Sequence, residues 1–175
     1  MGKILVVVYS YTGTSRRLAQ LLCSQMGWPM GEITETRSRA GVLGSLKCIV
    51  DSVFGLCPPV LYVGPEPRDF QTVVLIAPIW AYRLAAPMRS FVAERSDRLP
   101  RVAVVAVMGG KGGANAASEI GELLGRAPLL ATSFTTREVE DGSCASRLEA
   151  FGATLQASGT RDEPVRPAMW SPSAG

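Results

Sequence analysis

Three continuous apolar runs constrain the fold of this chain more than any other feature of its sequence. They cover residues 4–9, 73–79 and 102–108 and are rich in β-branched side chains. A strand that is apolar at every position, rather than at alternate positions, has both of its faces covered. Strands of this kind occur in parallel sheets that lie between two layers of helices. The sequence therefore predicts an α/β fold.

The segments between these runs carry helical patterns. Residues 15–26 place Leu18, Leu21, Leu22 and Met26 on one apolar stripe. Further helices are predicted at 43–54, 86–95, 114–124 and 143–157, and two shorter candidate strands at 30–34 and 129–135. Five strands that alternate with five helices predict a three-layer sandwich with a five-stranded parallel sheet and helices on both faces.

The length of the chain favours one domain. Its 175 residues can bury a core that needs neither disulfides nor a metal. We assign the domain to residues 1–159 and expect residues 160–175 to form an irregular C-terminal tail. Within the domain, an insertion at about residues 35–71 contains a proline-rich stretch, which predicts a surface segment. That insertion is either a lid near a ligand site or simple padding.

Composition excludes several classes of protein. The chain is 47% apolar and 19% charged, which excludes a disordered protein. Its longest apolar run, residues 73–82, is far shorter than the roughly 20 residues needed to span a bilayer. We therefore expect a cytoplasmic protein that does not enter a membrane. The chain has no histidine, so we predict no histidine-based catalysis. Its four cysteines form no CxxC pair, so we predict no metal site and expect the thiols to be reduced.

Hydroxyl side chains and a glycine follow the first predicted strand. The segment consists of Ser10, Tyr11, Thr12, Gly13, Thr14 and Ser15, and it leads into a predicted helix. Main-chain N–H groups at the start of a helix lack partners and lie at the positive end of the helix dipole, which suits a phosphate. The simpler interpretation is that Thr14 or Ser15 caps the helix. One cap requires one hydroxyl rather than four, so we favour an anion site.

Two further segments follow the other buried strands. Pro78, Ile79, Trp80, Ala81 and Tyr82 end the third predicted strand, and Gly109, Gly110, Lys111, Gly112 and Gly113 follow the fourth. The two aromatic rings can offer flat faces to a planar ligand, although Trp80 alone would be expected at the edge of the core. The glycines allow close approach of a ligand to the backbone, or they form a flexible turn. The glycine segment lacks the GxxxxGK(S/T) pattern of a nucleotide P-loop.

These segments resemble those of the flavodoxin family. SYTGTS is similar to the flavodoxin phosphate loop, Ser/Thr-x-Thr-Gly-x-Ser/Thr, and PIWAYRLAAPMRSF is similar to the second cofactor loop of long flavodoxin-like proteins. RSRAGVLGSLKCIVDSVFG resembles the helical insertion that such proteins carry before that loop. The resemblance covers about residues 3–155. It implies a flavodoxin-like sheet with strand order 2-1-3-4-5 and the cofactor FMN.

The resemblance also implies roles for individual residues. Ser10, Thr12, Gly13, Thr14 and Ser15 would hold the phosphate, with Tyr11 adding a backbone amide. The segment from Pro78 to Tyr82 would line the ribityl chain and the ring, and the segment from Gly109 to Gly113 would meet the polar edge of the ring. No catalytic side chain is implied, because the flavin itself carries the redox chemistry. A phosphoacceptor receiver domain shares this fold but needs acidic residues after the first strand, and residues 1–31 contain none.

Charge separates this sequence from acidic flavodoxins. The net charge is +3 and the pI is about 8.8. All three predicted ligand segments lie in stretches without acidic residues, namely 1–31, 70–93 and 98–118. We expect a positive field around the flavin, which would raise its reduction potential above that of an acidic flavodoxin. The alternative is that the arginines simply face solvent.

Two functional classes follow from the resemblance. The first is an FMN-binding flavodoxin-like protein that transfers electrons between protein partners. The second is an NAD(P)H-dependent FMN oxidoreductase of the quinone reductase type. A third interpretation is a module that has kept the fold without binding flavin. The expected partner is a redox protein or NAD(P)H, with no nucleic acid, and the prediction leaves room for a homodimer.

Overall fold

The computed structural model describes residues 3–35, 59–110 and 113–158. The helix predicted at residues 43–54, the tail at 160–175, Lys111 and Gly112 lie outside these described residues. Of the insertion predicted at about 35–71, the structure describes Glu35 and residues 59–71.

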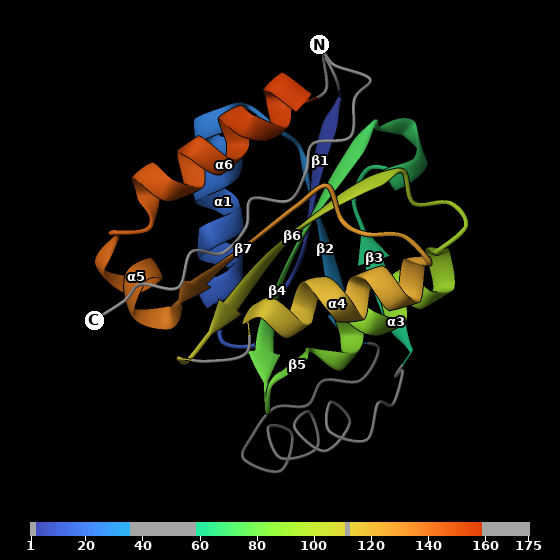
Figure 1. The fold of residues 1–175 in the computed structure, drawn as a ribbon, viewed down its shortest axis with the longest axis horizontal. Helices are drawn as coiled ribbons and strands as arrows, with labels where there is room; N and C mark the ends of the chain where they lie inside the picture. The colour runs from blue at the N-terminus through green and yellow to red at the C-terminus, as the bar shows by residue number, and fades with distance from the viewer. Residues whose placement is uncertain (1–2, 36–58, 111–112, 159–175) are drawn as a thin grey trace.

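Strands and helices alternate along most of the described chain (Figure 1). The strands are β1 (Ile4–Tyr9), β2 (Met30–Glu35), β3 (Val60–Val63), β4 (Thr72–Trp80), β5 (Arg83–Leu84), β6 (Arg101–Met108) and β7 (Leu130–Thr135). The helices are α1 (Thr14–Met26), α3 (Ala86–Arg95), α4 (Gly113–Leu124), α5 (Thr136–Asp141) and α6 (Ala145–Ser158), with a 3-10 turn at Pro67–Asp69. None of the helices within the described ranges combines the length and apolar character that crossing a membrane requires.

The five predicted strands form a parallel sheet. Their order is β2-β1-β4-β6-β7, which confirms the predicted order 2-1-3-4-5. In the centre of the sheet, Val74 of β4 lies between Val6 of β1 and Ala103 of β6. The strand order reverses direction between β1 and β4, because the chain leaves β1 toward one edge and later returns toward the other.

The predicted strand count of five was too low. The sheet has seven strands within the described residues, and the two additional strands are antiparallel. β3 extends the sheet beside β2, with Tyr62 opposite Ile33. β5 pairs with the end of β4, with Arg83 opposite Trp80. β3 is four residues long and lies inside the proline-rich insertion, and β5 has only two residues, so neither is long enough for a periodic pattern to reveal.

The central strand β1 shows why its sequence is apolar throughout. Ile4, Val6 and Val8 pack in one part of the core with residues of α1 and α6, whereas Leu5, Val7 and Tyr9 pack in the other part with residues of α3 and α4. All six side chains are buried, with exposed fractions of 3% or less. Figure 1 shows the corresponding layers, with α1 and α6 on one face of the sheet and α3 and α4 on the other. The predicted three-layer sandwich is confirmed.

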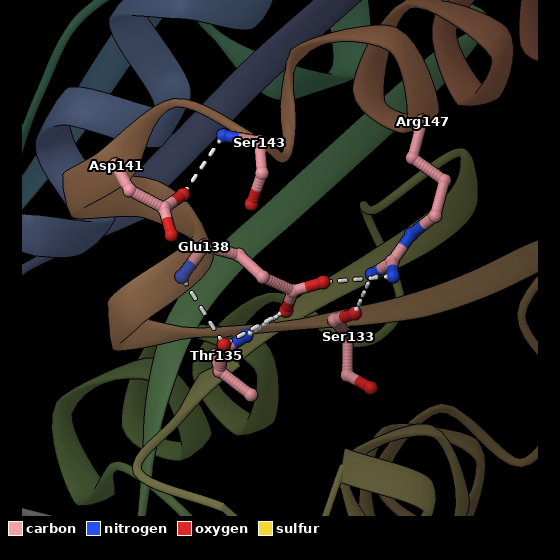
Figure 2. Close-up of polar contacts among 6 residues, drawn as sticks. All are labelled: Ser133, Thr135, Glu138, Asp141, Ser143 and Arg147. Atoms are coloured by element: carbon pink, nitrogen blue, oxygen red, sulfur yellow. Dashed lines mark hydrogen bonds and ion pairs between the residues drawn. The ribbon is translucent and has the colours of Figure 1, made fainter.

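A polar network fixes the corner formed by β7, α5 and α6 (Figure 2). The N–H of Glu138 donates to the Thr135 hydroxyl, and the Glu138 carboxylate accepts from the Thr135 N–H, so the two residues form a capping box. Arg147 of α6 donates to Glu138 Oε1 over 2.9 Å and to the Ser133 carbonyl over 2.5 Å. Its guanidinium also lies 4.4 Å from the centre of the Phe134 ring. These contacts tie the last helix to the edge of the sheet, and Thr135 pairs with Met108 at the carboxyl end of β6.

Candidate functional site

Three loops that follow neighbouring strands meet at one edge of the sheet. β1 ends at Tyr9, β4 at Trp80 and β6 at Met108, and the three strands are parallel and adjacent. Their carboxyl ends lie together at the lower edge in Figure 1, where α1 begins and the β4–β5 hairpin protrudes. This edge includes the point between β1 and β4 where the strand order reverses, and open parallel sheets bind ligands at such a point.

The loop between β1 and α1 leaves the start of the helix open. Gly13 is the residue that precedes the helix, and its φ of 94° is left-handed. Its N–H donates to Ser10 Oγ over 3.1 Å, and its carbonyl accepts the first helical hydrogen bond, from the Arg17 N–H over 3.0 Å. Among the described residues, no side chain caps this helix. Thr14 and Ser15 lie inside the helix, so the simpler interpretation in which one of them caps it is wrong.

Donor groups converge at this helix start. Thr12 Oγ1 and Thr14 Oγ1 lie 3.3 Å apart, with Thr12 exposed and Thr14 half-buried. Ser15 is buried, with an exposed fraction of 2%. The first N–H groups of an α-helix have no partner within the helix, so they add to the hydroxyl donors. Ser10 uses an acceptor position toward Gly13, and the proton of its hydroxyl can still be donated. The loop can therefore surround an anion with several donors.

Trp80 connects this loop to the end of β4. Its ring lies edge-on to Tyr9 at a centroid distance of 6.0 Å and to Tyr11 at 5.9 Å. Tyr9 is buried and its hydroxyl donates to Glu35 Oε1 over 2.7 Å, whereas Tyr11 is 37% exposed. Trp80 is half-buried and packs against the core. Trp80 therefore contacts the core, and its contact with a planar ligand stays a prediction.

The β4–β5 hairpin turns through two residues in an unusual conformation. Ala81 and Tyr82 have φ angles of 48° and 65°, and Trp80 and Arg83 on either side of them are paired. Positive φ at both central residues is the pattern of a type I′ turn, which Asn and Gly favour. For an ordinary side chain, the left-handed conformation costs roughly 1–2 kcal/mol per residue. Tyr82 is 60% exposed, so this strained turn carries an exposed aromatic residue.

Helix α4 contacts the same hairpin through two polar side chains. Asn115 Nδ2 donates to the Tyr82 carbonyl over 3.0 Å. Glu119 accepts from Arg83 Nε and from the Leu84 N–H, each over 2.7 Å, with one oxygen for each donor. These two residues were not predicted to be part of the site. The available signal was their spacing of four on a helix that follows the glycine segment, which places them on one face.

The remaining predicted site residues differ in how far they are exposed to solvent. Gly109 and Gly110 are exposed, and an added Cβ on either would meet no atom within 4 Å. Gly113 is the first residue of α4. Pro78 is half-buried, but Ile79 is only 7% exposed and belongs to the core. The Ile79 side chain therefore supports the site from beneath and leaves contact with a ligand to its neighbours.

Two arginines of the acid-free segments have carboxylate partners. Arg16 pairs with Glu32 of β2, and Arg83 pairs with Glu119 of α4. These carboxylates come from segments that are distant in the sequence but adjacent in space. The positive field around the site is therefore weaker than the net charge and the acid-free segments predict.

Comparison with known proteins gives matches among solved structures alone. No family model matches the sequence, and no curated protein matches it. A flavoprotein from Lactobacillus acidophilus NCFM, solved in complex with FMN, has a TM-score of 0.65 at 16% identity, over 82% of this chain and 99% of that chain. A flavodoxin, WrbA-like protein from Agrobacterium tumefaciens has a TM-score of 0.60 at 10% identity, over 91% and 98%.

The flavodoxin of Streptococcus pneumonia TIGR4 is a further match, with a TM-score of 0.54 at 13% identity, over 89% of this chain and 98% of that chain. Identities this low indicate a shared fold. The likeness extends over the whole sandwich and agrees with the strand order found here. This chain therefore has the flavodoxin-like fold.

Proposed function

We propose that this protein binds FMN at the carboxyl edge of β1, β4 and β6 and acts in electron transfer. The observation that carries the proposal is the uncapped first turn of α1, which follows the left-handed Gly13 and lies beside the hydroxyl groups of Ser10, Thr12 and Thr14. A phosphate monoester carries up to two negative charges, and this arrangement of amides and hydroxyls suits such a group. The FMN complex of the Lactobacillus acidophilus flavoprotein, which has a similar fold, supports the same choice of cofactor.

The residues around the helix start fit the remainder of FMN. Tyr11, Trp80 and Tyr82 lie on the two loops beside the anion site and present aromatic surface that suits a planar ring. Gly109 and Gly110 bring exposed backbone to the same edge, with no side chain in front of it. FMN supplies the redox chemistry when it is bound, so the protein needs to provide only binding, orientation and electrostatics.

The side chains at this edge would orient the ring. Trp80 is held from two directions by Tyr9 and Tyr11, so its surface has a defined orientation before any ligand arrives. The hydroxyls of Thr12 and Thr14 would donate to the phosphate, and the α1 dipole would add to this attraction. In this role the protein would exchange electrons with a redox partner protein in the cytoplasm.

The basic character of the chain favours a second candidate, an NAD(P)H-dependent FMN oxidoreductase of the quinone reductase type. The net charge is +3, and Arg17 is an exposed residue of the first turn of α1, the helix whose start forms the proposed anion site. Positive charge near the flavin would attract an anionic nicotinamide cofactor.

Anaerobic mixing of the FMN-loaded protein with NADPH distinguishes the two functions. For an electron carrier, we expect the visible flavin absorbance to persist until a separate reductase is added. For the oxidoreductase, the absorbance would bleach rapidly with NADPH alone. Free FMN at the same concentration serves as the control for uncatalysed reduction. If the purified protein failed to take up FMN, both candidates would be wrong, and the flavin-free module would be favoured.

A further inference from the structure

We propose that Asn115 and Glu119 are positioning residues, which hold the Ala81–Tyr82 turn in its left-handed conformation and thereby place the Trp80 and Tyr82 rings at the site. The inference rests on the proposed function in one respect, because it takes FMN as the ligand that the two rings meet. The hydrogen bonds that hold the turn are a property of the protein alone.

The turn requires an external support. Ala81 and Tyr82 both have positive φ, although neither is a residue that favours this conformation. The hairpin stem is short: β5 pairs with β4 through Ile79–Leu84 and Trp80–Arg83, and the Ala85 N–H adds one hydrogen bond to the Pro78 carbonyl over 3.0 Å. β5 has β4 as its only neighbouring strand in the described residues, although the Leu84 side chain is buried in the core. With so few hydrogen bonds in the stem, contacts from outside the hairpin can contribute to balancing the strain at Ala81 and Tyr82.

Asn115 and Glu119 provide these contacts, which reach the three consecutive residues Tyr82, Arg83 and Leu84. Asn115 Nδ2 donates to the Tyr82 carbonyl over 3.0 Å, which fixes the peptide group that leaves the turn. The two oxygens of Glu119 accept from Arg83 Nε and from the Leu84 N–H, each over 2.7 Å. The Glu119 side chain is 16% exposed, so its carboxylate is largely shielded from water, whereas the Arg83 side chain is 41% exposed.

The position of these residues on α4 also connects two loops of the site. Asn115 and Glu119 lie one helical turn apart and face the same direction. α4 begins at Gly113, immediately after the glycine segment that follows β6. The hydrogen bonds of Asn115 and Glu119 therefore couple the start of α4 to the turn that carries Tyr82, and they are made in the absence of a ligand. Preorganisation of this kind strengthens binding because less ordering occurs on association.

The first test uses the protein without FMN. In Glu119→Gln, one of the two donors faces an amide nitrogen, and in Asn115→Asp the donor to the Tyr82 carbonyl is lost. Glu122→Gln is the matched control, because Glu122 is an exposed residue of the same helix and the charge change is identical. We expect amide hydrogen exchange at Leu84 to accelerate about tenfold or more in Glu119→Gln, equivalent to about 1.4 kcal/mol of opening free energy, and to be unchanged in Glu122→Gln.

The second test measures binding of FMN and of riboflavin, which lacks the phosphate. We expect Glu119→Gln to weaken both ligands by the same factor, about tenfold, because the ring loses its support and the phosphate site does not. Adding Ala81→Asn to Glu119→Gln should restore most of the affinity, since Asn favours the left-handed conformation. If Glu119 supported the fold elsewhere and did not hold the turn, Ala81→Asn would not restore the FMN affinity of Glu119→Gln.

The outcomes separate the inference from the proposed function. If the amide of Leu84 exchanged at the same rate in Glu119→Gln as in the wild type, the inference would be overturned. It would also be overturned if Leu84 exchanged faster in Glu119→Gln but the variant bound FMN as tightly as the wild type. If Glu119→Gln failed to fold, Asn115→Asp would be judged by the FMN and riboflavin comparison and by rescue with Ala81→Asn. If wild-type protein did not bind FMN, the proposed function would fall, and the exchange experiment would still decide whether Glu119 holds the turn.

Discussion

At the residue scale, backbone conformation shapes both sides of the candidate site. Gly13, Ala81 and Tyr82 all adopt left-handed conformations at the edge where the three loops meet. Glycine reaches this region at no steric cost, whereas Ala81 and Tyr82 do not. Strained residues of this kind gather at functional sites, where the surrounding structure maintains them. Here the maintaining contacts come from Asn115 and Glu119.

The strain at Ala81 leads to a prediction about stability. Replacing Ala81 with Asn should raise the free energy of unfolding of the protein without FMN by about 0.5–1 kcal/mol, because Asn tolerates a positive φ better. Urea unfolding at neutral pH provides the measurement. Ala93→Asn is the control, since Ala93 is an exposed position of α3 where Asn should destabilise the helix by a few tenths of a kcal/mol. Equal destabilisation by both changes would show that the turn is not strained.

Some site residues could be predicted from the sequence and others could not. Thr12, Gly13 and Thr14 were identified because they are consecutive and follow a recognisable buried strand. Asn115 and Glu119 were missed because their partners in the hairpin are 33 to 36 residues away in the sequence. Long-range contacts of this kind leave no local pattern, and the conformation of Ala81 contradicts its local preference.

At the element scale, β3 is fixed by one aromatic side chain. The Tyr62 ring lies against Gly31 of β2, and a Cβ added to Gly31 would come within 2.6 Å of the ring carbons. The Tyr62 hydroxyl donates to the Pro65 carbonyl over 2.6 Å, and the ring lies 5.1 Å from that of Phe91. Burial raises the pKa of Tyr62 to about 12, so the hydroxyl keeps its proton at neutral pH.

Gly31 should therefore tolerate no side chain while Tyr62 is present. Gly31→Ala is expected to lower the free energy of unfolding by about 1–3 kcal/mol through overpacking. In a Tyr62→Ala background, the same change should cost little, because the obstructing ring has gone. A double-mutant cycle measured by urea unfolding gives the coupling between the two positions. Additive effects would contradict the packing described here.

The capping box of α5 gives a prediction with a defined pH dependence. The hydrogen bond from the Thr135 N–H, followed by smaller effects of the Thr135 hydroxyl and Arg147, lowers the pKa of Glu138 below its ordinary value of 4.5. The charged carboxylate is thus favoured in the folded state. Its contribution to stability is present above the unfolded pKa and is lost as the pH falls through the lower folded value.

We expect Glu138→Gln to cost about 1 kcal/mol of unfolding free energy at neutral pH, in the range of other helix caps. The difference from wild type should shrink when the pH lies well below 4.5. Urea unfolding at the two pH values makes the comparison, and the exposed Glu140→Gln serves as control. A cost that does not change with pH would show that the charge on Glu138 is unimportant.

The elements themselves were predictable to different degrees. The helix predicted at 86–95 has the bounds of α3, and the continuous apolar runs lie within one residue of β1, β4 and β6 at each end. α5 was not predicted, although Thr135 and Glu138 match the capping-box spacing that marks a helix start. β5 could not be predicted, because two residues carry no periodicity and their pairing depends on the preceding turn.

At the scale of the whole molecule, the sequence order of strands and helices determined the sandwich. Fully apolar strands demand cover on both faces, and right-handed connections leave few topologies for five parallel strands. The order 2-1-3-4-5 additionally rested on the resemblance to flavodoxins, and the sheet confirms it. The charge distribution was less predictable, because Glu32 and Glu119 approach Arg16 and Arg83 through folding alone.

The net charge of +3 predicts the redox behaviour of bound FMN. Two-electron reduced FMN is an anion at neutral pH, and a positive environment stabilises it. The reduction potential should therefore lie above that of an acidic flavodoxin measured under the same conditions, by an amount limited by the ion pairs of Arg16 and Arg83. Spectroelectrochemical titration of both proteins provides the comparison. An equally low potential in this protein would refute the electrostatic prediction.

The most direct measurement is a titration of the FMN-free protein with FMN and with riboflavin, for the wild type and for the Thr12→Val/Thr14→Val variant. Valine keeps the shape of threonine but cannot donate to the phosphate. Two charge-assisted hydrogen bonds of about 1.5–3 kcal/mol each predict at least a hundredfold weaker binding of FMN by the variant. Riboflavin should bind equally to both proteins. Equal FMN affinity in the wild type and the variant would contradict the anion site at the start of α1.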